Sequence, residues 1–127
     1  MIDHISLGVR DLAASAVLYD RVLAALGYTR LVTRASTVGF GKKYADFWLN
    51  HRPGLVRDPA SGTHVCLRAR SQEVVHAFHA GALAAGARDA GAPGPRPEYH
   101  PAYYAAFIRD FDEHVIEVVT FLSSDAS

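Results

Sequence analysis

Two histidines of this chain occupy equivalent places in two copies of one sequence pattern. The first copy reads "DHISLGVRDLAASAVLYDRVLAALGY" from Asp3, and the second reads "THVCLRARSQEVVHAFHAGALAAGAR" from Thr63, so that His4 matches His64. A copied unit of this length is typical of a fold built from two similar halves. Two equivalent imidazoles brought together by such a fold are the start of a metal site.

A carboxylate completes a ligand set with the two histidines. Glu117 stands in the last predicted strand, and the alternation of side chains along strands places it with His4 and His64 on a polar sheet face. Two imidazoles and a carboxylate suit divalent iron, manganese, cobalt, nickel or zinc. Three protein ligands leave positions open for water or substrate, as a Lewis-acid site requires. The alternative is that the three residues are relics in a protein that binds its ligand without metal.

Four further residues are candidate substrate contacts: Ser6, Trp48, Cys66 and Arg68. Ser6, Cys66 and Arg68 lie on the predicted face that carries the histidines. Arg68 could hold a carboxylate or phosphonate, or could simply reach solvent. Trp48 could stack on a planar substrate or only fill space. Cys66 also fits as a small buried residue, since nothing near it in sequence argues for a reactive thiol.

The segment "EYHPAYY" provides candidate catalytic residues at the start of a predicted strand. His100, Tyr103 or Tyr104 could act as a general acid or base, or could hydrogen-bond a substrate oxygen. The alternative is that these rings only pack on the loop before the strand. The sequence leaves open which of the three, if any, moves a proton.

The elements that must position these residues repeat along the chain. Each copy is predicted to form a strand, a helix and three strands, with the first helix over residues 12–25 between Asp11 as N-cap and Gly27 as stop. Ser71 is the predicted cap of the second helix. Residues 87–102 are predicted to be a long Pro/Gly-rich loop. A hairpin of strands 103–110 and 113–121 is predicted to close the second copy.

The chain length and the order of predicted elements favour a single α+β domain. The 127 residues suit one domain over 1–122, made of modules 1–51 and 62–122 with a linker at 52–61, and 123–127 are expected to be a disordered tail. Thirteen basic residues balance thirteen acidic ones, so charge gives no reason to expect nucleic acid or a membrane as partner. The single cysteine excludes an intrachain disulfide. A soluble cytoplasmic protein is expected.

With these residues in view, the chain resembles the vicinal oxygen chelate superfamily, which includes glyoxalase I, extradiol dioxygenases, fosfomycin-resistance enzymes and bleomycin-binding proteins. The resemblance covers residues 2–121 and rests on the openings of both copies and on "HPAYYAAFIRDFDEHVIEVV". It implies two βαβββ modules whose curved mixed sheets form a cup around a metal, with the helices outside. It also implies a homodimer, sometimes with modules exchanged between chains.

The family's ligand positions carry over to His4, His64 and Glu117. The fourth position, in the last strand of the first module, is Trp48, which cannot ligate a metal. This departs from the four-ligand arrangement of glyoxalase I and agrees with the dioxygenase and fosfomycin-resistance branches. The potassium-site and thiol-substrate signatures of a fosfomycin enzyme are not evident.

Two main functions remain open at this point. The first is a metal-dependent lyase, isomerase or dioxygenase acting on a small oxygen-rich substrate. The second is a metal-free binding protein, for example for an antibiotic, with Trp48, Tyr103 and Tyr104 as stacking walls. An inactive partner module is a third, weaker interpretation. The sequence does not decide whether His4 joins the other two ligands within one chain or from a partner chain.

Overall fold

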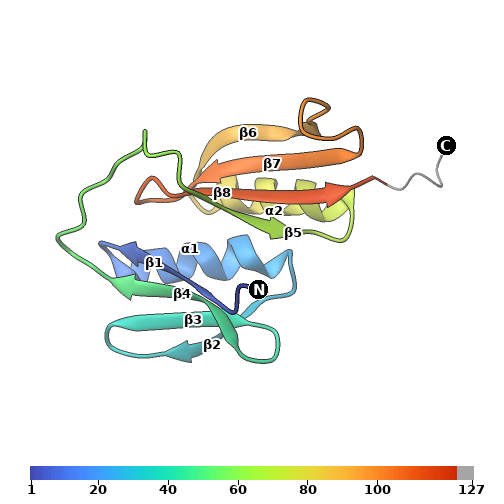
Figure 1. The fold of residues 1–127 in the computed structure, drawn as a ribbon. Helices are drawn as coiled ribbons and strands as arrows, with labels where there is room; N and C mark the ends of the chain where they lie inside the picture. Colours follow the sequence, from blue (N-terminus) through green and yellow to red (C-terminus); the bar gives the residue numbers. More distant parts are fainter. Residues whose placement is uncertain (123–127) are drawn as a thin grey trace.

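The computed structural model describes residues 1–122 and folds them into two modules of the same design (Figure 1). Each module runs strand, helix and three strands, as the repeat predicts. The first contains β1 (Ile5–Val9), α1 (Leu12–Ala24), β2 (Thr29–Thr33), β3 (Thr37–Gly41) and β4 (Ala45–His51). The second contains β5 (His64–Arg68), α2 (Gln72–Ala84), β6 (Arg88–Pro95), β7 (Tyr103–Arg109) and β8 (Val115–Phe121).

Each module forms its own four-stranded mixed sheet, in the orders β1-β4-β3-β2 and β5-β8-β7-β6. The first strand pairs parallel with the last, and the other pairs are antiparallel. Ser6 lies opposite Trp48 in the first sheet, and Cys66 lies opposite Glu117 in the second. Because Ser6 and Cys66 are equivalent in the repeat, Trp48 occupies the place of Glu117. The predicted α+β fold with two βαβββ modules is confirmed.

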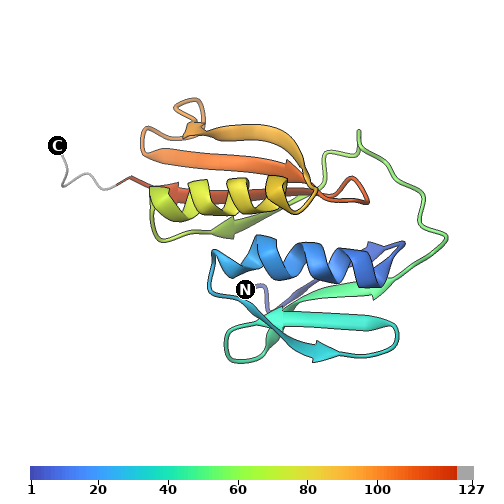
Figure 2. The ribbon, with the colours of Figure 1, turned by 180° about the vertical axis from the view of Figure 1, so that it is seen from behind.

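One face of each sheet is covered by its helix. The helices lie side by side, and Figure 2 shows them in front of the sheets. Strand alternation turns apolar side chains toward them, and the residues predicted to be buried there do pack in or against the core, namely Ile5, Leu7, Val65, Leu67, Ile116 and Val118. The other face of each sheet is free of helices. It is this face that carries the candidate site residues of β1, β4, β5 and β8.

Both helices begin at the predicted caps. The carboxylate of Asp11 accepts a hydrogen bond from the amide of Ala14 at 3.0 Å, and the hydroxyl of Ser71 accepts one from the amide of Val74 at 3.3 Å. Gly27 has a φ of 80°, a left-handed conformation that glycine adopts without strain. The chain therefore leaves α1 where the sequence predicts.

The predicted loop over residues 87–102 is wrong for its first half, where the structure has the edge strand β6. An edge strand tolerates proline because one side of its backbone needs no partner. β6 pairs with β7 through two register shifts, between Asp89 and Gly91 and between Gly91 and Gly94. A side chain at Gly91 would lie 2.9 Å from the ring of Phe107, so glycine lets the two strands approach. The glycines and prolines that predicted a loop are therefore part of an irregular strand.

Polar contacts at the β7–β8 turn tie the second module to the first. Asp112 accepts hydrogen bonds from the backbone amide and the guanidinium of Arg10 at 3.1 and 3.0 Å. Asp110 accepts one from the hydroxyl of Tyr19 in α1 at 2.6 Å. An imidazole nitrogen of His114 lies 2.7 Å from a carbonyl oxygen of β1. We call these five residues the inter-module cluster.

The two sheets lie edge to edge and do not close into a cup within the described chain (Figure 1). In this respect the expected cup is not complete in one copy of the protein. No strand or helix is present between His51 and His64, where the linker is predicted. The tail expected to be disordered lies outside the described residues. None of the described helices is long and apolar enough to cross a membrane.

Candidate functional site

His64, Glu117 and Tyr103 form one hydrogen-bonded cluster on the open face of the second sheet. They come from the neighbouring strands β5, β8 and β7. Nε2 of His64 lies 3.0 Å from Oε1 of Glu117, and the hydroxyl of Tyr103 donates to Oε2 at 2.5 Å. The side chain of Glu117 is 4% exposed and that of His64 is 43% exposed. A buried carboxylate is thus held against an imidazole that remains open to solvent.

Loss of hydration and the carboxylate of Glu117 raise the pKa values of Tyr103 and Cys66. Loss of hydration, followed by the hydrogen bond to Glu117, raises the pKa of Tyr103 far above its ordinary value. Cys66 is exposed, so the expectation of a buried residue is wrong, but partial loss of hydration and the nearby charge of Glu117 still raise the pKa of its thiol to about 12. Both groups therefore stay protonated at neutral pH. Tyr103 can donate a hydrogen bond or a proton there, but it is not a base.

His4 does not join this cluster. It directly precedes β1, and its Nδ1 lies 2.9 Å from a carboxylate oxygen of Asp3, with 55% of the side chain exposed. Within residues 1–122, no three side chains of His, Cys, Asp or Glu are grouped closely enough to hold a metal ion. His4 and His64 do line one cavity of about 360 Å³, which opens between the two sheets. One chain thus brings together two of the three predicted ligands.

The first sheet presents Trp48 where the second presents Glu117. The indole nitrogen donates to the carbonyl of Ala45 at 3.2 Å, and the guanidinium of Arg34 lies 6.0 Å from the ring centre. The ring covers Gly39, where an added Cβ would lie only 2.8 Å from the indole. Ser6 is exposed on the next strand, opposite Trp48. The last strand of the first module therefore offers an aromatic surface in place of a ligand.

The remaining predicted residues lie around the cluster or away from it. Arg68 extends over the ring of Phe121, with its guanidinium carbon 4.6 Å from the ring centre. His100 caps the turn before β7, where its Nδ1 accepts a hydrogen bond from an amide at 2.9 Å. Tyr104 faces the opposite side of the sheet, and its hydroxyl lies 2.7 Å from the imidazole of His76 in α2. Adjacent residues of a strand point to opposite faces, so only Tyr103 of the tyrosine pair reaches Glu117.

The structure adds two features that sequence reasoning missed. Phe107 shares the open face with Tyr103, and its ring centre lies 6.4 Å from that of His64. Its position four residues after Tyr103 in one strand is the signal that would have found it. Asp46 lines the cavity between the sheets, and its Oδ1 is buried without a hydrogen-bond partner among the described residues. Tyr28 donates to its other oxygen at 3.2 Å.

Comparison with known proteins identifies similar structures. A glyoxalase/bleomycin resistance protein from Albidiferax ferrireducens T118 is 28% identical, with a TM-score of 0.81 over 92% of this chain and 95% of the other. A glyoxalase/bleomycin resistance protein/dioxygenase family enzyme from Burkholderia phytofirmans PsJN is 18% identical, with a TM-score of 0.75 over 95% and 98%. The fosfomycin resistance protein FosX from Listeria monocytogenes is 18% identical, with a TM-score of 0.71 over 94% and 91%. No family model matches the sequence, and no curated protein matches it either.

Proposed function

We propose, on the premise that this chain has the fold of the vicinal oxygen chelate superfamily, that it is a metal-dependent enzyme acting on a small oxygen-rich substrate. The observation that carries the proposal is the pair of His64 and Glu117. Their ligating atoms lie 3.0 Å apart on neighbouring strands of an open sheet face. Imidazole nitrogen and carboxylate oxygen are donors for divalent iron, manganese, cobalt, nickel and zinc.

The residues that one chain places around this pair are suited to a metal ion. Tyr103 holds the second oxygen of Glu117 and so orients the carboxylate, as outer hydrogen bonds do at metal sites. The carboxylate is buried, while 43% of the His64 side chain is exposed. That exposure leaves room for a further ligand and for substrate.

We propose that a second copy of the chain supplies His4. This residue is the counterpart of His64 in the repeat, is exposed, and has only its neighbour Asp3 as a partner among the described residues. Both sheets keep an open face, and a closed cup requires two such faces to meet. In a two-fold dimer each first module would then face the second module of the other copy. Each of the two sites would contain His4 from one chain with His64 and Glu117 from the other.

At such a site, each of the chain's own residues would have a separate role. A bound divalent ion would supply a Lewis acid for negative charge that develops on a chelated substrate. Tyr103 would donate a hydrogen bond or a proton to a substrate oxygen, because its raised pKa keeps the hydroxyl protonated. Trp48 would form an apolar wall against a planar substrate, with Ser6 beside it and Cys66 beside Glu117.

This arrangement supports lyase, isomerase and dioxygenase chemistry alike. Trp48 occupies the place of a fourth ligand, so the four-ligand arrangement of glyoxalase I is not favoured. The metal distinguishes the remaining options. Turnover that needs iron and dioxygen would indicate a dioxygenase, whereas turnover with nickel, zinc or manganese would indicate isomerisation or addition.

The experiment is metal analysis of protein purified without a histidine tag. We expect about one divalent ion per chain in the wild type and little or none in Glu117→Gln, because the amide is a much weaker ligand than the carboxylate. His51→Ala is the matched control, since His51 is exposed and lies away from the cluster. Absence of metal from the wild type, after addition of iron, manganese, nickel and zinc in turn, would refute the proposal.

One observation favours the second candidate, a metal-free binding protein. Both oxygens of Glu117 already have hydrogen-bond partners in the chain, so the cluster is stable without an ion. In such a protein the rings of Trp48, Tyr103 and Phe107 would contact the ligand directly. A ligand that binds unchanged to chelator-treated protein, and equally well to His4→Ala, would support this function over the enzyme.

A further inference from the structure

A second, larger cavity lies between the modules, apart from the cluster of His64, Tyr103 and Glu117. Its volume is about 670 Å³, which is within the usual range for small-molecule sites. The C-terminal end of α1, the end of β5, the first turn of α2 and the end of β8 surround it. None of the predicted metal ligands lines it.

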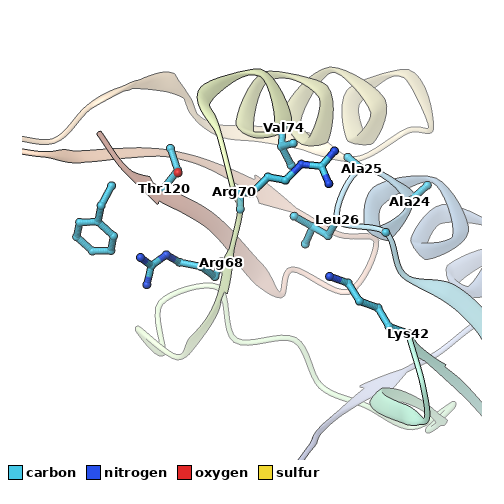
Figure 3. A pocket seen from close by; sticks show the side chains of 11 residues that line it. Ala24, Ala25, Leu26, Lys42, Arg68, Arg70, Val74 and Thr120 are labelled. Atoms are coloured by element: carbon cyan, nitrogen blue, oxygen red, sulfur yellow. The ribbon is translucent and has the colours of Figure 1, made fainter. Parts of the chain in front are cut away.

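The charged residues that line this cavity are all basic: Lys42, Arg68 and Arg70. Lys42 comes from the first module, whereas Arg68 and Arg70 come from the second. Figure 3 shows the side chain of Arg70 passing above Leu26 and that of Lys42 ending below it, while Arg68 extends away in the opposite direction. Within residues 1–122, none of the three makes an ion pair or a side-chain hydrogen bond. The guanidinium of Arg68 lies over the ring of Phe121.

Nearby backbone dipoles do not neutralise this charge. The C-terminal end of α1 at the cavity carries about half a negative charge, which attracts Lys42. The N-terminal turn of α2, represented by Val74, carries about half a positive charge and offsets it. The net charge of the whole chain is zero, so three cations around one cavity are a local excess. Arginine guanidinium groups and a lysine ammonium are the groups that proteins use for phosphate and carboxylate.

We infer that this cavity binds a small organic anion that carries a phosphate or several carboxylate groups. The oxyanion would lie between Lys42 and Arg70 and so bridge the two modules. Leu26, Ala69 and Val74 would contact the apolar part of the molecule. This inference concerns a different site from the one proposed above, and it holds whether or not the protein binds a metal.

The test is calorimetric titration of chelator-treated protein with pyrophosphate and, separately, with tricarballylate. The two probes distinguish a phosphate site from a carboxylate site. We expect at least one to bind, and we expect its Kd to weaken by about tenfold or more in Lys42→Gln/Arg70→Gln, as loss of charge-assisted hydrogen bonds implies. The control is Lys43→Gln/Arg21→Gln, which removes the same charge from exposed residues outside the cavity. Its Kd should match that of the wild type.

Three outcomes would overturn the inference. The first is that neither probe binds the wild type. The second is that the cavity variant and the control variant weaken binding equally, because the effect would then be general electrostatics. The third is that His64→Ala abolishes binding, which would place the anion at the candidate metal centre. Circular dichroism of both double variants keeps loss of fold separate from loss of binding.

Discussion

The inter-module cluster allows a quantitative prediction, because one oxygen atom can be removed from it without changing the packing. Tyr19 is fully buried, and its hydroxyl donates to Oδ2 of Asp110 at 2.6 Å. The other oxygen of Asp110 accepts the amides of Asp112 and His114, both at 2.9 Å. In Tyr19→Phe the buried Oδ2 loses its donor. Hydrogen bonds to charged groups are worth about 1.5–3 kcal/mol, so we expect a loss of about 2 kcal/mol in the free energy of unfolding at pH 7.

The loss should depend on pH. Burial raises the pKa of Asp110, and the hydrogen bond from Tyr19 opposes that rise. In Tyr19→Phe the pKa therefore rises further. A carboxyl whose pKa is raised by folding contributes most stability below its unfolded pKa and loses that contribution as the pH rises through its folded pKa. The penalty of the substitution should therefore be largest at neutral pH and should shrink as the pH falls through the raised pKa of Asp110, which lies above 3.8.

Urea unfolding, followed by the fluorescence of the single tryptophan, measures this effect. Tyr28→Phe is the matched control, since its hydroxyl is 3.2 Å from Asp46 and the residue is only half-buried. We expect a loss below about 1 kcal/mol for the control. Equal urea midpoints for the two variants at pH 7 would refute the reasoning. So would a Tyr19→Phe penalty that stays constant from pH 7 to pH 4.

Three further predictions test other parts of the structure. Cys66 should react with iodoacetamide at pH 8 roughly two to three orders of magnitude more slowly than a free thiol. The reason is that the pKa of its thiol is about 12 instead of 9.0. A reaction rate like that of free cysteine would contradict this prediction. Gly39→Ala should displace Trp48, which should lower the free energy of unfolding by about 1–3 kcal/mol and shift the tryptophan emission. Gly54 has open space around it, so Gly54→Ala should change neither the stability nor the emission. Asp89→Asn should lower the free energy of unfolding at neutral pH and should have no effect well below pH 3.8. The hydrogen bond from His79 lowers the pKa of Asp89, so the stability that the carboxylate contributes is lost as the pH falls through that lowered pKa. An equal difference between the unfolding curves of variant and wild type at neutral and at low pH would contradict this prediction.

The fold could be predicted in most of its parts because the repeat carries two independent signals. The alternation in β1 and β5 and the helical spacing after Asp11 and Ser71 each recur, so these strands and helices are each supported twice. β6 has no such support, since its glycines and prolines are typical of loops. It becomes a strand only because β7 lies beside it, which is a tertiary effect that local sequence does not record.

The candidate site could be predicted within a module but not between modules. His64 and Glu117 meet because they lie on neighbouring strands of one sheet, and strand alternation already places them on one face. The place of His4 depends on how the modules pack, and that is decided by side chains such as Tyr19 and Asp110, far apart in sequence. Neither residue stands out in a motif. The same is true of Lys42 and Arg70, which line one cavity only because the two modules pack together.

The most direct test of the proposed site is a mixing experiment. His4→Ala and His64→Ala chains, each purified alone, should contain no metal. After the two are unfolded and refolded together, we predict metal at about one quarter of the wild-type content per chain, because half of the dimers are mixed and each mixed dimer has one intact site. No metal in the refolded mixture, from a wild type that binds it, would contradict a site built from two chains.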